Sequence, residues 1–270
     1  MTDDSEQRYY QLCEILAGYG RVAVAYSGGV DSSLLAHAAL ETLGSDNVLI
    51  LHGVSCLQSQ YDLKLVRNDL ERDPLLVKAY CQVNLDPLEW ADFVENSERR
   101  CYFCKRHLYG RLLKESAKAG CAVLVDGTNS DDQNADRPGL LAIKELDIQT
   151  PLDAVKLGKK EIRLMAARFR LSAHDRLSNS CLATRIPRSI PISFELLQLV
   201  ERGEDFLRGQ GFRGCRVRPR KKEIVIQVLD QDFVRLSCSR VRHGIVSYFQ
   251  DVGLGSVAVE LKGRPVDLLG

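Results

Sequence analysis

A short glycine- and serine-rich run at residues 23–33, Ala-Val-Ala-Tyr-Ser-Gly-Gly-Val-Asp-Ser-Ser, constrains the fold of this chain most strongly. Val22, Val24 and Tyr26 alternate as one face of a strand, and apolar residues at helical spacing follow the run. A glycine turn between a strand and a helix N-terminus exposes backbone N–H groups and the positive end of the helix dipole, so the run predicts a phosphate-binding loop. The residues expected to hold phosphate or Mg²⁺ are Ser27, Gly28, Gly29, Asp31, Ser32 and Ser33.

The loop differs from two common phosphate-binding motifs. No Gly-Lys-Ser/Thr follows it, as in a Walker A loop, and the dinucleotide fingerprint G-x-G-x-x-G is absent. Ser-Gly-Gly-x-Asp-Ser-Ser resembles the pyrophosphate loop of the ATP-pyrophosphatase (PP-loop) superfamily, whose members activate an acyl or carbonyl-like oxygen with AMP and release pyrophosphate. The alternative is a helix cap without a ligand, which is disfavoured because a cap needs one hydroxyl and not a cluster.

Length and composition indicate a globular protein with an ample core. The 270 residues suit one large domain, or one domain with a smaller one, and 45% are hydrophobic and 27% charged. The formal net charge of +1 argues neither for a nucleic-acid partner nor for an acidic one, and we do not expect a nucleic-acid partner. The N-terminus does not read as a signal peptide, and no apolar run approaches the ~20 residues that span a bilayer. We therefore expect a cytoplasmic protein, in which nine cysteines indicate thiol, metal or sulfur chemistry instead of disulfides.

Apolar strands alternate with amphipathic helices over the first two-thirds of the chain. The expected strands are 22–26, 48–54, 76–83 and 122–126, and the expected helices are 32–43, 61–71, 104–119 and 159–169. This order predicts an α/β protein with a doubly wound, mainly parallel sheet that binds ligands at the carboxyl ends of its strands.

The composition changes near two prolines, Pro187 and Pro191, which we interpret as a linker. Beyond it, helices at 193–207 and 231–249 and strands at 215–218, 223–229 and 256–261 predict a small α+β domain for substrate binding or oligomerisation. We therefore divide the chain into domains 1–184 and 185–270.

Three cysteines form the second signal. Cys101 and Cys104 lie in Arg-Arg-Cys-Tyr-Phe-Cys-Lys, and Cys181 lies in Ser-Asn-Ser-Cys-Leu-Ala-Thr-Arg. Cys-x-x-Cys fits redox pairs, zinc sites and iron–sulfur ligation, but a zinc knuckle would show a second such pair. Three cysteines without a fourth suit a [4Fe–4S] cluster with one open iron. In the alternative, the pair merely begins a helix and Cys181 is a free thiol.

Two further segments are rich in residues that bind anions or cations. The polar segment 126–139 follows a buried strand, and its Gly127, Thr128 and Asn129 are expected to line a nucleotide crevice, although a plain surface loop is the alternative. Arg216 and Arg218 alternate on a strand and so share one face, where guanidinium groups can bind phosphates and carboxylates. A solvated basic turn is the alternative for residues 213–222. Arg185 is a further candidate for substrate binding, and so is Glu204, which lies on the helix before this strand and could pair with one of these arginines.

Several motifs together resemble the LarE family of ATP-dependent sulfur insertases, which help to build the nickel-pincer nucleotide cofactor of lactate racemase. They are Ser-Gly-Gly-Val-Asp-Ser-Ser, Arg-Cys-Tyr-x-Cys-Lys, Asp-Gly-Thr-Asn-x-Asp-Asp, Arg-Pro-Gly-Leu, Pro-Leu at 151–152, Lys-x-Glu-Ile-Arg at 159–163 and Cys-Leu-Ala-Thr-Arg-Ile-Pro. The resemblance runs from about residue 20 to residue 230.

The resemblance implies a reaction and its participants. ATP, with Mg²⁺, would adenylate a carboxylate of a pyridinium-3,5-dicarboxylate mononucleotide, and a sulfur nucleophile would displace AMP to give a thiocarboxylate. Cys181 matches the cysteine whose sulfur some members donate, and members with three cysteines hold an iron–sulfur cluster; this chain has Cys101, Cys104 and Cys181, which favours the cluster. Asp31 and Cys181 would act in catalysis. Expected partners are a sulfur donor, a nickel-insertion protein and further copies of the chain.

Departures from the family pattern leave parts of this reading open. Cys56-Leu-Gln-Ser-Gln-Tyr lacks an expected proline-rich form, and Gln227 stands where a Glu is expected. The alternatives are an amide-forming ligase similar to NAD or GMP synthetase, a tRNA thiolase, and a non-catalytic nucleotide- or zinc-binding module. The ligase would have no use for the three cysteines, and the thiolase would want a more basic surface.

Overall fold

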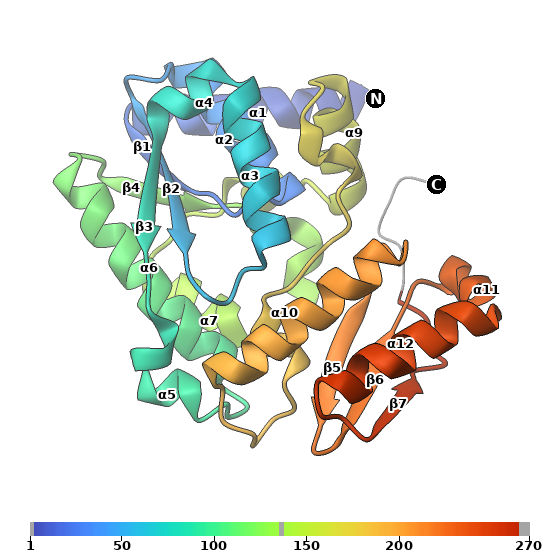
Figure 1. Ribbon diagram of the computed structural model, residues 1–270. Coiled ribbons are helices and arrows are strands. Elements are labelled where there is room, and N and C mark those ends of the chain that lie inside the picture. The colour runs from blue at the N-terminus through green and yellow to red at the C-terminus, as the bar shows by residue number, and fades with distance from the viewer. Residues whose placement is uncertain (1–2, 135–137, 265–270) are drawn as a thin grey trace.

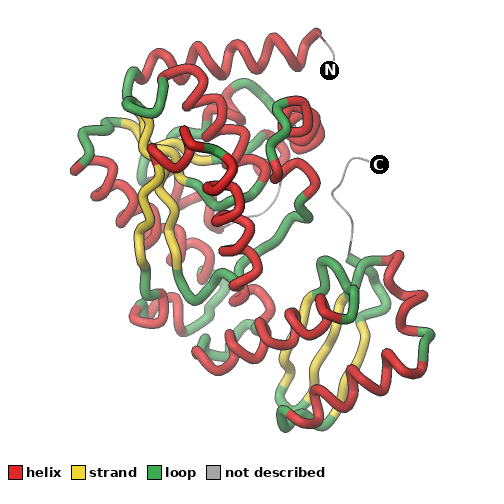
Figure 2. The backbone as a smooth tube through the Cα atoms, turned by 45° about the horizontal axis from the view of Figure 1, so that its top comes forward, coloured by secondary structure: helices red, strands yellow, loops and turns green. Residues whose placement is uncertain are grey.

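A computed structural model describes residues 3–134 and 138–264 of the chain. Its larger sheet has four parallel strands in the order β3-β2-β1-β4: β1 (Val22–Ala25), β2 (Val48–Val54), β3 (Tyr80–Asn84) and β4 (Val123–Asp126). Figure 1 shows this sheet between helices, and Figure 2 shows its strands apart from those of a second, smaller sheet. The doubly wound parallel sheet predicted from the sequence is confirmed, and it fits the PP-loop fold.

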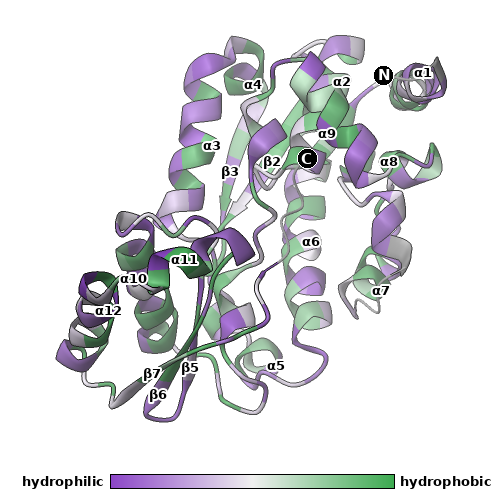
Figure 3. Cartoon of the chain, turned by 90° about the vertical axis from the view of Figure 1, so that its right-hand side faces the viewer, coloured by the Kyte–Doolittle hydropathy of each residue, from purple (hydrophilic) through white to green (hydrophobic). Residues whose placement is uncertain are grey.

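Helices cover both faces of the larger sheet. Val22 and Val24 pack on one side with α1 (Asp3–Tyr19), α2 (Val30–Leu43) and α9 (Lys159–Arg168), whereas Ala23 packs on the other with α6 (Arg100–Lys118) and α7 (Pro138–Glu145). Successive side chains of a strand point to opposite faces, so a strand buried on both must be apolar throughout. Figure 3 shows green and purple residues on the same helices, as expected where one face of a helix is buried.

The connections between these elements include several short helices. They are α3 (Gln60–Arg72), α4 (Pro74–Ala79), α5 (Ala91–Val94) and α8 (Pro151–Ala154), with 3-10 turns at Pro87–Glu89, Ser130–Asn134, Ser172–Asp175 and Leu182–Arg185. The strand expected at 76–83 is therefore partly wrong. Asp73 caps Leu75 and Leu76, and Pro74 occupies the first helical turn, so residues 74–79 form a helix and the strand begins at Tyr80.

The C-terminal part forms a mixed three-stranded sheet with helices on one side. Strands β5 (Arg216–Arg220) and β6 (Glu223–Gln227) are antiparallel, and β7 (Ser256–Val259) lies parallel to β6. The helices are α10 (Phe194–Gly209), α11 (Phe233–Leu236) and α12 (Ser239–Asp251), preceded by a 3-10 turn at Asp230–Asp232. The single helix expected at 231–249 is thus divided, because Cys238 adopts an extended conformation between α11 and α12.

One apolar cluster joins the two parts. Leu57, Phe93 and Leu182 of the first part pack with Ile192 and Val200 of the second. The predicted boundary at 184/185 falls within the 3-10 turn Leu182–Arg185 and remains a prediction. Among the helices of residues 3–134 and 138–264, none is both long and apolar enough to cross a membrane.

Candidate active site

The predicted phosphate loop lies at the carboxyl edge of the larger sheet, between the end of β1 and the start of α2. Ser32 ties the loop together, since its hydroxyl donates to the Gly29 carbonyl (3.1 Å) and accepts from the Ser27 N–H (3.2 Å). Gly29 precedes α2 without a side-chain cap. The positive end of a 14-residue helix therefore faces the cavity described below without a capping side chain, which suits an anionic ligand.

Gly28 adopts a left-handed conformation with φ +74°. Its carbonyl accepts from the Arg176 guanidinium (2.7 Å), which also binds Asp69 (2.5 Å), and a Cβ at this position would overlap Val66 Cγ2. The largely buried Arg176–Asp69 ion pair thus holds the backbone of the loop in place at Gly28. No local sequence pattern predicts these two contacts, because Arg176 is more than 100 positions from both Gly28 and Asp69.

We expect Gly28→Ala to weaken ATP binding by at least tenfold, because the methyl group forces the loop away from Val66 and out of its left-handed conformation. The matched variant is Gly29→Ala: Gly29 has φ −76°, and its Cβ would meet only Ser27 Oγ at 3.4 Å. Calorimetric titration with ATP and Mg²⁺ compares the two. Equal affinities would contradict the assigned role of the Gly28 conformation.

Asp31 lies in the first turn of α2, where its carboxylate forms an ion pair with Lys159 and accepts from the Asn129 amide (3.2 Å). Lys159 begins α9, 128 residues further along the chain, and was not among the predicted site residues. A carboxylate beside a phosphate-binding loop fits a Mg²⁺ ligand. When Mg²⁺ binds the Asp31 carboxylate, the Lys159 ammonium can pair with a phosphate group of the ligand instead.

The segment after β4 lies against the loop. A Cβ on Gly127 would come within 2.9 Å of the Ser32 N–H nitrogen, so only glycine permits this close approach. Asp126 accepts from the Thr128 N–H (2.8 Å), from the Thr128 hydroxyl and from the Tyr109 hydroxyl. Gly127, Thr128 and Asn129 are thus beside the loop, while residues 135–137 of the predicted polar segment lie outside the described residues. Their predicted role in nucleotide binding remains a prediction.

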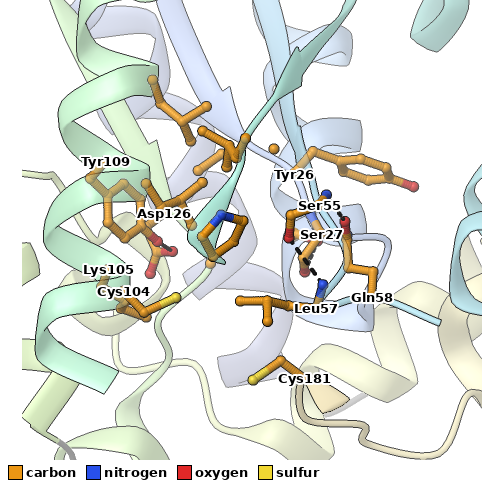
Figure 4. A pocket seen from close by; sticks show the side chains of 18 of the residues that line it. Tyr26, Ser27, Ser55, Leu57, Gln58, Cys104, Lys105, Tyr109, Asp126 and Cys181 are labelled. Carbon is orange, nitrogen blue, oxygen red and sulfur yellow. Dashed lines mark hydrogen bonds between the residues drawn. The ribbon is translucent and has the colours of Figure 1, made fainter. Parts of the chain in front are cut away.

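A cavity of about 300 Å³ connects the loop to two of the predicted cysteines. Ser27, Asp31 and Ser32 line one part of it, and Cys104 and Cys181 line another (Figure 4). Sequence reasoning missed most of its remaining wall, which includes Ala25, Tyr26, Gly53, Ser55, Leu57, Gln58, Leu85, Pro87, Trp90, Lys105, Leu108, Tyr109, Leu112, Asp126 and Asp132. Many of these are ordinary apolar residues whose place depends on the tertiary fold.

The three predicted cysteines come from two elements. Cys101 and Cys104 lie one turn apart on α6, and Cys181 precedes the turn Leu182–Arg185. Burial and the neighbouring thiols raise the pKa of Cys104 to about 12. Burial also raises the pKa of Cys181, although the Arg100 and Arg185 charges oppose that shift. Unbound, both groups are therefore protonated at neutral pH.

The donor chemistry of these three cysteines fits an iron–sulfur cluster, since thiolates are its usual ligands. Their arrangement does not yet amount to a metal site: within the described residues, no three His, Cys, Asp or Glu side chains are grouped so that they could hold a metal ion. The cluster remains a prediction.

A buried histidine supports one wall of the cavity. His52 Nε2 accepts from the Gln58 amide (2.9 Å), and its Nδ1 bonds the Tyr80 hydroxyl (2.8 Å), while Gln58 Oε1 accepts from the Ser55 N–H (3.2 Å). His52 is 1% exposed, and burial lowers its pKa to about 4. The imidazole is therefore neutral and holds Gln58 and Ser55 against the cavity.

We expect acid to destabilise the protein through His52. Below pH 6.5 the unfolded chain binds a proton that the folded chain takes up only near pH 4, so unfolding becomes easier by about 3 kcal/mol across that window. His52→Gln removes this dependence, whereas a Gln at the exposed His243 leaves it unchanged. Denaturant titrations between pH 7 and pH 4 measure both slopes. Parallel slopes for wild type and His52→Gln would refute the assignment.

Arg185 and Glu204 form a buried ion pair of 2.8 Å in which both side chains are 1% exposed. Arg185 also donates to the carbonyls of Ser180 (2.7 Å) and Cys181 (3.1 Å), and Glu204 accepts from the Val217 N–H (3.2 Å). Their contacts position the Cys181 segment against β5. Direct substrate binding by these two residues remains a prediction.

Arg216 and Arg218 lie on the face of β5 opposite the core residue Val217. Arg218 donates weakly to the Thr184 carbonyl (3.3 Å), which places it beside the Cys181 segment. The buried Nε atoms of both arginines lack a hydrogen-bond partner among the described residues. Burial and the charges of Arg264, Arg185 and Arg218 lower the pKa of Arg216 to about 10. Partly buried cations that repel one another form a surface suited to an anion.

Comparison with known proteins identifies relatives along nearly the whole chain. The protein is 29% identical to the uncharacterized protein slr1717 of Synechocystis, over 96% of this chain and 95% of that protein. It is 28% identical to the pyridinium-3,5-bisthiocarboxylic acid mononucleotide synthase of Lactiplantibacillus plantarum, over 89% of this chain and 82% of the synthase. No family model matches the chain. At 32% identity over 90% of both chains, this protein belongs to the same family as the uncharacterized protein MJ0830 of Methanocaldococcus jannaschii.

Proposed function

We propose that this protein is an ATP-dependent sulfurtransferase that converts a carboxylate of pyridinium-3,5-dicarboxylate mononucleotide into a thiocarboxylate, as the LarE family does. One observation carries the proposal: a single cavity is lined both by the phosphate loop and by Cys104 and Cys181. An enzyme that activates a carboxylate with ATP and then attacks it with sulfur needs those two groups within reach of one bound substrate.

The homology to the Lactiplantibacillus plantarum synthase supports the same reaction class, because that protein is named for a bisthiocarboxylic acid mononucleotide product. The motifs shared with LarE proteins include both ends of the cavity, the loop at 27–33 and the segment that contains Cys181. The proposal therefore joins a named relative to a geometry found in this chain.

The first half of the proposed reaction makes the carboxylate reactive. A carboxylate oxygen attacks the α-phosphorus of ATP, the bond to the β-phosphate breaks, and pyrophosphate leaves. The N-terminus of α2 and Lys159 would stabilise the charge on the leaving pyrophosphate, and Asp31 would hold Mg²⁺ there. The product is an acyl-adenylate, whose AMP is a good leaving group.

The second half replaces AMP by sulfur. A sulfur nucleophile attacks the activated carbonyl carbon, the bond to AMP breaks, and a carbon–sulfur bond remains. Cys101, Cys104 and Cys181 would hold the iron–sulfur cluster, which when bound supplies a sulfide ligand on its open iron. If no cluster is bound, the Cys181 sulfur itself is the candidate nucleophile. It would form a thioester with the substrate, and loss of the Cα proton with cleavage of the Cβ–S bond would then release the thiocarboxylate and leave dehydroalanine at position 181. Burial raises the pKa of the Cys181 thiol, and the charges of Arg100 and Arg185 oppose that rise and so make its thiolate more accessible.

Arg216 and Arg218 would bind the anionic groups of the mononucleotide. Their Nε atoms lack partners among the described residues, and Arg218 contacts the carbonyl of Thr184 beside Cys181. A substrate phosphate or carboxylate would provide the missing acceptors and offset the burial and the charge repulsion that lower the Arg216 pKa. The C-terminal part would thereby hold the substrate while its ring enters the cavity.

A Cys181→Ser variant separates the two halves. We expect it to release pyrophosphate at a rate within a few-fold of wild type in the presence of the mononucleotide, but to form no thiocarboxylate, because the serine hydroxyl is a poor nucleophile and a poor iron ligand. The matched control is Cys238→Ser, at an exposed cysteine on the start of α12. Wild-type thiocarboxylate formation by Cys181→Ser would refute the proposed role.

Iron and acid-labile sulfide, measured on the same proteins purified without oxygen, decide the source of sulfur. Equal amounts of both in wild type, lost in Cys181→Ser and kept in Cys238→Ser, support the cluster. Thiocarboxylate formation without iron, together with loss of the Cys181 sulfur, supports direct donation by the side chain. Absence of pyrophosphate release in wild type would contradict the enzyme proposal and favour a nucleotide- or zinc-binding module.

A further inference from the structure

Trp90 is an unassigned aromatic residue in the wall of the cavity. It is the single tryptophan of the chain and lies between the 3-10 turn Pro87–Glu89 and α5. Neither the motifs nor the adenylation chemistry gives it a role. Its surroundings, however, are those of a rigid ring that can stack on a ligand.

Its neighbours hold the indole on two sides. The His107 ring stacks on it with centroids 4.6 Å apart and planes 16° apart, and the ring of Phe93, itself buried, lies 6.3 Å away with its plane at 80° to the indole. Asp92 in turn holds His107, with 3.0 Å between Nε2 and Oδ1. His107 thus covers one face of the indole, and the indole also lines the cavity.

The apolar clusters divide the cavity into two parts. Ala25, Leu85 and Leu108 pack against the core beneath α6, on the side of the larger sheet. Trp90, Cys104 and Cys181 all pack instead against the cluster of Leu57, Phe93 and Leu182. Trp90 therefore belongs to the part of the cavity that contains the two cysteines, and not to the part that Ala25, Leu85 and Leu108 line.

We propose that Trp90, backed by His107 and Asp92, is the stacking platform for the cationic pyridinium ring of the substrate. This inference rests on the proposed function and deepens it. Sulfur is added to a carboxyl carbon attached directly to the ring, so the ring must lie at the cysteine end. An indole face attracts a flat cation more strongly than a neutral ring, because the ring quadrupole is negative on its face. The platform would thus select for the quaternised, positively charged form of the ring.

The single tryptophan makes the inference directly measurable. Pyridinium-3,5-dicarboxylate mononucleotide should quench the Trp90 emission with saturation. In Trp90→Leu the dissociation constant of this mononucleotide, measured by calorimetry, should rise roughly tenfold, with a smaller rise in Trp90→Phe. The dissociation constant of ATP should stay within twofold of wild type in both. The matched control is Tyr10→Leu, which removes an aromatic ring that is 62% exposed on α1 and should change neither constant.

The outcomes separate this inference from the function on which it rests. Binding of the mononucleotide without a change in Trp90 emission, or with equal affinity in Trp90→Leu, overturns the platform and leaves the sulfurtransferase proposal intact. Equal losses of ATP and mononucleotide affinity in both Trp90→Leu and Trp90→Phe indicate a structural role and also overturn it. No binding of the mononucleotide to wild type overturns the proposed function, and the platform with it.

Discussion

Asp31→Asn is expected to lower ATP-dependent pyrophosphate release by about a thousandfold, since it removes the charge that would hold Mg²⁺ at the leaving phosphates. The structure makes this expectation more specific, because the Lys159 ammonium forms an ion pair with the Asp31 carboxylate. In the variant, Lys159 loses its ion-pair partner, so its charge is no longer shared with a carboxylate. ATP binding without Mg²⁺ should therefore fall much less than catalysis. Pyrophosphate release, followed with the mononucleotide present, measures the effect.

The control for this variant is Asp46→Asn, which disrupts an exposed ion pair with Lys78 at the opposite end of β2. Exposed ion pairs contribute about 0–1 kcal/mol, so Asp46→Asn should leave both stability and activity unchanged. Asp31 is 20% exposed, and its loss should cost no more than about 1 kcal/mol of unfolding free energy. Unchanged pyrophosphate release by Asp31→Asn would refute its place in adenylation, while unfolding of the variant would be visible in its denaturation curve.

The sequence predicted the sheet well because burial on both faces leaves a pattern along single strands. Residues 22–25 are all apolar and pack alternately against the two helical layers. The helix α1 was missed although its buried residues Tyr9, Leu12 and Leu16 recur at helical spacing. The helical periodicity of these apolar residues in the N-terminal segment is sufficient to predict α1.

The site was predictable only where one segment contains the chemistry. The loop at 27–33 is such a segment, because strand, turn and helix start are contiguous. The contact between Asp31 and Lys159 joins residues 128 positions apart, and the stack of Trp90 on His107 depends on how α5 meets α6. Neither follows from spacing along the chain. The basic strand β5 could be predicted in part. Alternation along the strand correctly placed Arg216 and Arg218 on the face opposite Val217, but it could not predict that their Nε atoms lack hydrogen-bond acceptors among the described residues.

Arg185 and Glu204 present a different problem, because the residues expected to touch substrate are almost wholly buried against each other. Removing one partner of a buried ion pair leaves an uncompensated charge, which costs about 3–5 kcal/mol. We therefore expect Arg185→Met to lower the unfolding free energy by that amount. Lys118→Met, which breaks an ion pair of an exposed lysine with Glu115, should change it by less than about 0.5 kcal/mol. Denaturant titrations compare them.

The double variant Arg185→Met/Glu204→Leu distinguishes stability from function. Replacing both charges with apolar side chains of similar size removes the unpaired charge, so it should recover most of the stability lost in Arg185→Met. It cannot recover the hydrogen bonds from Arg185 to the carbonyls of Ser180 and Cys181. Thiocarboxylate formation should therefore remain at least tenfold below wild type while pyrophosphate release persists. Recovery of both stability and sulfur transfer would mean that the segment holds Cys181 in place without Arg185, and that the ion pair serves folding alone.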